Sequence, residues 1–213
     1  MLLALSVHEA AHAYAAYKLG DHTAKLAGRL TLNPLAHLDP MGTILFLIVG
    51  FGWGKPVPVN PYYFKHPKRD SAITAFAGPL SNFLLAIASL LLLKLSAGSL
   101  ASSSAFSLLD AGTGDANIFL AFLHSFLAAF VFLNLGLMAF NLIPIAPLDG
   151  SKILALFIPP RFEDDYDRFM EYGPYVLLAL LIGENILHVS ILSWWIQSVM
   201  GGVLSLFSAV FGG

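Results

Sequence analysis

Two long stretches of this chain carry no formal charge, and they constrain its fold more than any other feature. Residues 71–93 lie between Asp70 and Lys94, and residues 116–148 end just before Asp149. About 20 uncharged, mostly apolar residues are enough to cross the hydrocarbon core of a bilayer as a helix. Of the 213 residues, 11% are charged, against about 25% in a soluble domain. The sequence therefore predicts an all-α polytopic membrane protein folded as a helix bundle.

Shorter segments complete what we expect to be a single domain over residues 1–213. Residues 1–18 predict a helix that ends near Gly20, a residue suited to a helix C-cap. Residues 160–171 predict an acidic surface helix or loop. Two apolar stretches, 177–187 and 191–211, predict one or two final spans, although Glu184 interrupts the first.

The segments between the predicted spans are less regular. Residues 41–51 are apolar but too short to span, so they predict a re-entrant or partly buried segment. Residues 52–61 are rich in proline and glycine and predict a short extended, β-like edge segment. Residues 95–115 are rich in serine and glycine and predict a loop.

The basic residues predict an orientation. Of the eleven lysines and arginines, seven lie between Lys18 and Arg69 and three between Lys152 and Arg168. The positive-inside rule places both regions in the cytoplasm and the 95–115 loop outside. The absence of cysteine excludes disulfides and thiolate metal ligands. No basic run or glycine-rich phosphate loop points to a nucleic-acid partner.

The pentapeptide His8-Glu9-Ala10-Ala11-His12 lies inside an apolar stretch. Two histidines four residues apart share one face of a helix, so both imidazoles can reach the same metal ion. Glu9 is placed to accept a proton from a metal-bound water. The alternative is a packed histidine pair with a buried glutamate, which would leave three polar groups desolvated in the bilayer. The sequence favours a metal site.

Such a site needs a third ligand, and Asp149 is the strongest candidate. It follows a predicted span, in a stretch broken by Pro144, Pro147 and Gly150. Irregular backbone at membrane depth is tolerated where protein buries it or where it lines a wet cavity. Asp149 also fits a simple turn and helix cap. The ligand role is favoured because catalytic zinc commonly has two histidines, one acidic residue and a water.

Two asparagines in the apolar helices are further candidates. The amide of Asn82 would be unsatisfied against lipid, so it should face the bundle. There it is a candidate to hydrogen-bond the substrate backbone or the oxyanion, with helix packing as the alternative. Asn141 presents the same choice, and packing or support of the neighbouring motif is slightly favoured.

Together these motifs resemble the site-2 protease family of intramembrane zinc metalloproteases, in its small prokaryotic form without a PDZ domain. The resemblance is carried by HEAAH at 8–12, GPLSN at 78–82 and NLIPIAPLDG at 141–150. Family members often read Asn-Pro-Asp-Gly at the last motif, whereas this chain has Leu148 before Asp149.

The resemblance implies a three-helix catalytic core and one zinc ion per chain, bound by His8, His12 and Asp149. It implies that Glu9 is the general base. It also implies cleavage of single-span membrane proteins within or near the bilayer, in regulated intramembrane proteolysis. The protein would then be a multi-pass component of a prokaryotic cell membrane.

A substrate for such an enzyme must unwind, because a transmembrane helix hides its carbonyl groups in hydrogen bonds. The prolines of residues 55–60 leave few backbone donors, but Val57, Val59 and Asn60 retain theirs. We expect these three residues to hold an unwound substrate by strand addition.

The competing interpretation is a non-enzymatic zinc transporter or sensor, with the histidines as a transit site and Glu9 as a ligand or proton carrier. Transport favours polar groups along a whole pathway, whereas this chain gathers its intramembrane polar groups at one depth. We therefore expect an enzyme whose partners are the bilayer and a single-span substrate. No oligomeric state is predicted.

Seven residues precede His8, and as a helix they cover about 10 Å of a hydrocarbon core about 30 Å thick. A helix that begins inside the bilayer leaves its first N–H groups unsatisfied. We therefore expect the natural protein to start upstream of Met1.

Overall fold

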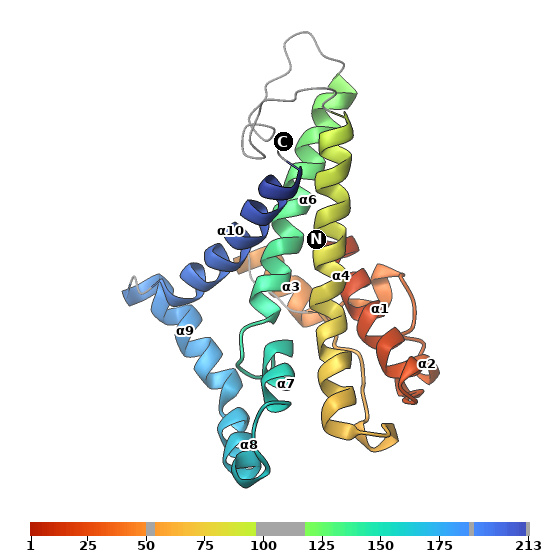
Figure 1. The fold of residues 1–213 in the computed structure, drawn as a ribbon, viewed down its shortest axis with the longest axis vertical. Coiled ribbons are helices and arrows are strands. Elements are labelled where there is room, and N and C mark those ends of the chain that lie inside the picture. The colour runs from red at the N-terminus through yellow and green to blue at the C-terminus, as the bar shows by residue number, and fades with distance from the viewer. Residues whose placement is uncertain (50–53, 97–117, 188–189, 212–213) are drawn as a thin grey trace. The chain divides into compact units, whose positions relative to one another are not determined.

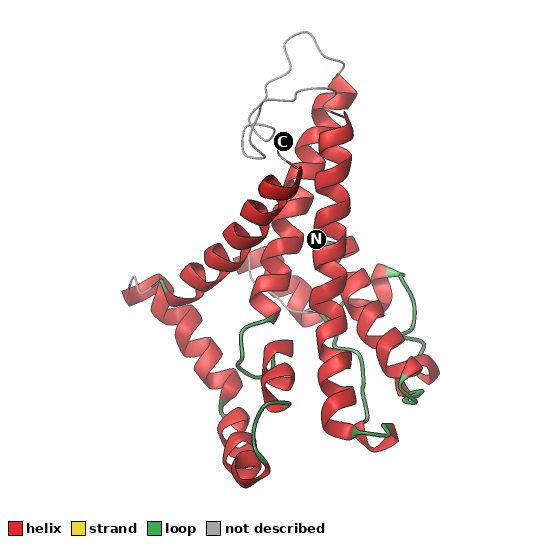
Figure 2. Cartoon of the chain, in the orientation of Figure 1, coloured by secondary structure: helices red, strands yellow, loops and turns green. Residues whose placement is uncertain are grey.

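Every regular element in the described part of the chain is a helix (Figure 2). The structure is a computed structural model that describes residues 1–49, 54–96, 118–187 and 190–211. Among these residues the β structure is one isolated antiparallel bridge between Leu38 and Gly54. The predicted all-helical fold is confirmed, and the predicted β-like edge segment is reduced to this bridge within the described residues.

The helices follow one another as labelled in Figure 1. The α-helices are α1 (Leu2–Lys18), α2 (Thr23–Leu26), α3 (Pro40–Val49), α4 (Pro67–Ser96), α6 (Ile118–Asn141), α7 (Asp149–Ala155), α8 (Glu163–Glu171), α9 (Gly173–Leu187) and α10 (Ile191–Phe211). Short 3-10 helices are η1 (Pro34–His37), η2 (Pro61–Tyr63) and η3 (Pro160–Phe162).

Three helical segments of the described chain are long and apolar enough to cross a membrane. They are Pro67–Leu95 in α4, Phe122–Asn141 in α6, and Ile191–Phe211, which is α10. The helices predicted over 71–93 and 116–140 are therefore present, and the C-terminal region adds one segment of spanning length. The shorter α9 is also apolar.

Two predictions fall wholly or partly on residues that the structure does not describe. Most of the predicted 95–115 loop lies outside the described residues, as do residues 50–53 at the end of the predicted re-entrant segment. The described part of that segment is α3, whose side chains Met41, Ile44 and Ile48 are exposed. Its re-entrant path stays a prediction.

The chain divides into two compact units. The first consists of Met1–Asn82 and Asn141–Ala179, and the second of Phe83–Phe140 and Leu180–Gly213. The first contains α1, the first half of α4, and α7. It therefore holds the HEAAH motif together with Asp149.

In the first unit, α1 contacts α4, and α1 also carries small residues that are buried. Ala4, Ala13 and Ala16 are completely buried, and small side chains let two helix backbones approach closely. The amide of Asn82 in α4 donates a 3.3 Å hydrogen bond to the carbonyl of Ala4. The two histidines of the motif lie on the same buried face.

Gly20 ends α1 as predicted. Its φ of 108° lies in the region that favours glycine. The N–H of Gly20 bonds to the carbonyl of Tyr17 at 3.3 Å, and the N–H of Asp21 bonds to that of Ala16 at 2.9 Å. This is the Schellman pattern, which satisfies the last carbonyls of a helix. The turn places Asp21 beside the segment that follows residue 54, because Asp21 accepts from the backbone N–H of Asn60.

Asp149 is placed by a tight break between α6 and α7. The chain turns over residues 142–148, and α7 begins at Asp149. A Cβ atom on Gly150 would lie 2.4 Å from the carbonyl oxygens of Leu142 and Ile143. A glycine is therefore required for the first turn of α7 to pack on the preceding turn.

In the second unit, charged side chains of neighbouring helices hold both ends of α10. Glu184 of α9 accepts a 2.7 Å hydrogen bond from the backbone N–H of Ser193, in the first turn of α10. Lys94 of α4 donates to the carbonyl of Phe211, the last residue of α10. Each charge has the sign that the helix dipole favours at that end. Glu184, which interrupts the apolar sequence of α9, thus caps the next helix.

Candidate metal centre

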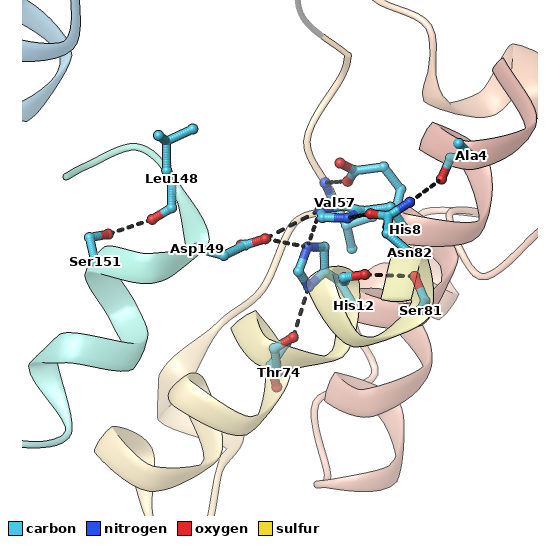
Figure 3. Close-up of polar contacts among 12 residues, drawn as sticks. Ala4, His8, His12, Val57, Thr74, Ser81, Asn82, Leu148, Asp149 and Ser151 are labelled. Atoms are coloured by element: carbon cyan, nitrogen blue, oxygen red, sulfur yellow. Dashed lines mark hydrogen bonds and ion pairs between the residues drawn. The ribbon is translucent and has the colours of Figure 1, made fainter. Parts of the chain in front are cut away.

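The structure brings His8 and His12 of α1 together with Asp149 of α7 (Figure 3). The Nε2 atoms of His8 and His12 each lie 3.2 Å from Oδ2 of Asp149, and they lie 3.0 Å from each other. Three donors bound tetrahedrally to zinc at about 2.0–2.1 Å would be about 3.3 Å apart. The arrangement of the three atoms therefore fits a single zinc ion.

The burial of these side chains supports the same interpretation. His8 and His12 are 4% and 9% exposed and Asp149 is 9% exposed. Oδ2 of Asp149 is buried and has no hydrogen-bond donor among the described residues. An unsatisfied buried carboxylate oxygen is costly unless a cation is close to it. The group could hold a metal ion, and the turn-and-cap alternative for Asp149 accounts for its place in α7 but not for this contact.

Both imidazoles are oriented by α4. Nδ1 of His8 lies 2.6 Å from Oδ1 of Asn82, and Nδ1 of His12 lies 2.7 Å from the backbone carbonyl of Thr74. Both partner oxygens are acceptors, so each Nδ1 carries the hydrogen and each Nε2 presents its lone pair. Such hydrogen bonds fix the tautomer and the ring orientation of a metal-binding histidine.

The side chain of Asn82 contacts groups of α1 within the chain. Its side chain is completely buried. Its Oδ1 contacts His8 and its Nδ2 donates to the carbonyl of Ala4. These contacts favour the packing alternative, in which Asn82 orients the imidazole of His8. Asn141 is half-buried at the last position of α6.

The sequence interpretation missed Thr74, and it named Gly78 as part of the GPLSN motif without giving it a role. A Cβ atom on Gly78 would lie 2.4 Å from Nε2 of His12 and 2.6 Å from Cε1 of His8. The imidazoles therefore lie directly against the backbone of α4. Thr74, Gly78 and Asn82 are spaced four residues apart, which puts them on one face of the helix. This spacing of small and polar residues within an apolar span was the available signal.

Glu9 lies next to the three-residue group without belonging to it. The cluster of ligand-type side chains found among the described residues consists of His8, His12 and Asp149. Oε2 of Glu9 accepts a 3.0 Å hydrogen bond from the backbone N–H of Val57. A carboxylate held by one oxygen keeps the other for proton transfer.

Two of the three backbone donors expected to bind a substrate already donate hydrogen bonds within the chain. The N–H of Val57 donates to Glu9, and that of Asn60 donates to Oδ2 of Asp21 at 2.7 Å. Neither donor is free to pair with a peptide in this structure. Val59, the third residue of the predicted set, is half-buried.

Residues 1–183 match the protein family described as "Peptidase family M50". The chain is 41% identical over 212 residues to a protein of Bacillus subtilis strain 168, YwhC, covering 99% of this chain and 90% of that protein. It is 31% identical over 186 residues to Rip2 of Mycolicibacterium smegmatis, and the match covers 85% of this chain and 64% of that protein. It is 30% identical over 192 residues to Rip2 of Mycobacterium tuberculosis strain H37Rv, and the match covers 87% of this chain and 66% of that protein. The names of all three begin "Putative zinc metalloprotease".

No solved structure matches the chain. The family match covers most of the sequence, including the HEAAH motif and Asp149. It agrees with the resemblance carried by the three motifs, and with a buried group of two histidines and one carboxylate that fits zinc. The chain therefore belongs to peptidase family M50, the site-2 protease family, and is a zinc metalloprotease of that family.

Proposed function

We propose that the protein binds one zinc ion through His8, His12 and Asp149 and hydrolyses single-span membrane proteins within or near the bilayer. The observation that carries this proposal is the convergence of two imidazole nitrogens and one carboxylate oxygen on one point. Both imidazoles are held there by α4, a helix of membrane-spanning length.

The depth of the site supports an intramembrane substrate. Gly78, which lies against both imidazoles, is seven residues beyond Ser71, the first residue of the charge-free stretch in α4. At 1.5 Å per residue this is about 10 Å along the helix. The hydrocarbon core is about 30 Å thick. A peptide bond cleaved at this position would lie within the apolar layer or close to it.

The chemistry follows from the donor set. His8, His12 and Asp149 would hold a zinc ion, which when bound would supply a Lewis acid and make water a stronger acid. Glu9 accepts the proton of the attacking water and returns it to the leaving amine, as a general base and then a general acid. The hydrogen bond from Val57 occupies Oε2 of Glu9, which leaves Oε1 for the proton.

The substrate is proposed to unwind and to lie along residues 54–60. Gly54 already pairs with Leu38 as an isolated bridge, and Val59 retains a backbone donor between Pro58 and Asn60. Strand addition of this kind binds extended peptides through main-chain hydrogen bonds. We propose a role in regulated intramembrane proteolysis, in a multi-pass protein of a prokaryotic cell membrane with the basic regions in the cytoplasm.

The test uses the zinc-loaded protein in liposomes together with a panel of single-span membrane proteins. Wild-type protein should cleave at least one of them within or beside its apolar segment, and Glu9→Gln should not. Zinc uptake by the liposomes at equal rates in both proteins, with no cleavage by either, would instead identify a zinc transporter.

A further inference from the structure

Arg29 is a buried cation that contacts backbone rather than a carboxylate. Its side chain is 6% exposed, and among the described residues it forms no salt bridge. Its guanidinium donates to the carbonyl of Lys55 and, at 3.4 Å, to that of Pro56. Burying a guanidinium without an acidic partner is costly, and here the two carbonyl groups compensate for part of that cost.

Arg29 contacts two peptide groups, and the more distant of them also contacts Glu9. The carbonyl of Pro56 and the N–H of Val57 belong to the same planar unit, and in a trans peptide they point in opposite directions. Arg29 lies on the carbonyl side, and Oε2 of Glu9 accepts from the N–H side at 3.0 Å. A cation at the carbonyl polarises the peptide group and strengthens its N–H as a donor.

Hydrogen bonds within the first unit fix both ends of the segment 55–60 that contains this peptide group. The N–H of Lys55 donates to the carbonyl of His37 at 2.9 Å. The N–H of Asn60 donates at 2.7 Å to Asp21, whose side chain is completely buried. Pro56 and Pro58 fix their own φ angles. The N–H of Val57 is therefore held at a defined place beside Glu9.

We propose that Arg29 and the backbone N–H of Val57 position the general base. They hold one oxygen of the Glu9 carboxylate so that the other faces the attacking water. This inference rests on the proposed function of Glu9. It gives Val57 a role inside the enzyme instead of the substrate pairing that its sequence position suggests, and it makes Arg29 a positioning residue that acts through the 56–57 peptide group.

The first experiment compares Val57→Pro with Val57→Ala in the full-length, zinc-loaded protein. Alanine keeps the backbone N–H and proline removes it, so the pair isolates the hydrogen bond from the side chain. Small misplacements of catalytic groups cost up to about 10²-fold in rate. We expect kcat of Val57→Pro to be at least about 10-fold below that of Val57→Ala, with equal zinc content and similar KM. Equal kcat values would overturn the proposal.

Arg29 is tested by rescue. Arg29→Met removes the cation and should lower kcat by about 10-fold at constant KM. Arg29→Lys returns a cation that can donate to a carbonyl and should recover part of the loss. If Arg29 had a purely structural role, both variants would give less folded protein, and the folded fraction would have the wild-type kcat and KM. That result would contradict the inference.

The third experiment does not depend on proteolysis. In protein labelled with ¹⁵N-valine, the Val57 amide should exchange its hydrogen at least about 10-fold more slowly in wild type than in Glu9→Ala, with the Val59 amide as the reference. Loss of Val57 protection in Glu9→Ala, with no proteolysis by wild type, would reject the proposed function but keep the contact. Proteolysis by wild type with unchanged Val57 exchange would reject the inference alone.

Discussion

The orientation of His8 and His12 is determined by α4 as much as by their own helix. Their spacing in α1 puts both rings on one face, but Asn82 and the Thr74 carbonyl select the nitrogen that each presents. With the hydrogen placed on each Nδ1, both Nε2 lone pairs are available, so the pair could hold one metal ion. The geometry of the two imidazoles therefore depends on a second helix that approaches the rings closely.

Because Gly78 has no side chain, the imidazoles of His8 and His12 can lie against the backbone of α4. A substitution at Gly78 tests this packing directly. Gly78→Ala would place a methyl group within 2.4–2.6 Å of both imidazoles, so the rings must move. We expect zinc affinity to fall by about 10–100-fold, the usual cost of disturbing the support of a metal ligand. Competition with a chelator measures the affinity. Gly136→Ala in α6, where a Cβ would meet nothing within 4 Å, is the control. Equal affinities would contradict the proposed packing.

Val59 tests the substrate segment at the same scale. Its backbone N–H is the member of the predicted donor set that no described contact occupies, whereas those of Val57 and Asn60 are engaged. Val59→Pro removes this donor. We expect KM for an unwound peptide substrate to rise by about 5-fold, the equivalent of one hydrogen bond of about 1 kcal/mol. An unchanged KM would remove strand addition at this position.

At the scale of elements, the turn after α1 connects the HEAAH helix to the 54–60 segment. Burial raises the pKa of the Asp21 carboxyl, but hydrogen bonds from Thr23 and Asn60 outweigh it, and the pKa lies below its usual range. A carboxyl with a lower pKa in the folded state stabilises the fold above its unfolded pKa of about 3.9. That contribution is lost as the pH falls through the folded pKa.

We therefore expect the Asn60 amide, which donates to Asp21, to lose protection from hydrogen exchange as the pH falls below about 4. Asp21→Asn should abolish this pH dependence, because the asparagine amide does not titrate. The Leu35 amide, which donates to the side chain of Asn33, provides the reference. Equal pH dependence in wild type and Asp21→Asn would contradict the assignment.

A substitution at Glu184 tests whether its carboxylate caps the start of α10 in the second unit. Its carboxylate accepts from the N–H of Ser193, one of the donors that a helix leaves unpaired in its first turn. Glu184→Ala should weaken the start of α10 by about 1 kcal/mol, which is about 5-fold faster exchange of the Ser193 amide. Gln197→Ala, at an exposed position of the same helix, controls for the substitution. Unchanged exchange of Ser193 would show that the cap contributes nothing.

Some of these features could be predicted from the sequence because they are local. The apolar runs predict helices by their length, and the spacing of His8 and His12 predicts a shared face. The contact between His8 and Asn82 joins residues 74 positions apart, and that between Glu9 and Val57 joins residues 48 apart. Such pairings depend on how helices and loops pack, which local pattern does not specify. Asp149 could be predicted because zinc that is bound by two histidines commonly has an acidic residue as its third ligand.

At the scale of the whole molecule, α4 relates the site to the membrane. The chain has no cysteine, so single cysteines report their own accessibility. Residue 65 precedes α4. A cysteine introduced there (Lys65→Cys) should react with an impermeant maleimide from the cytoplasmic side, as the positive-inside rule requires. Leu95→Cys, which is 77% exposed near the end of α4, should react from the opposite side. Labelling of both from one side would contradict a spanning α4.

We propose that one zinc ion is held by His8, His12 and Asp149 while Glu9 acts as the base without binding the metal. The most direct measurement is zinc content and cleavage of a single-span substrate in Glu9→Gln. We expect about one zinc per chain, as in wild type, with cleavage reduced by at least about 10²-fold. Loss of zinc in this variant, or cleavage at the wild-type rate, would contradict it.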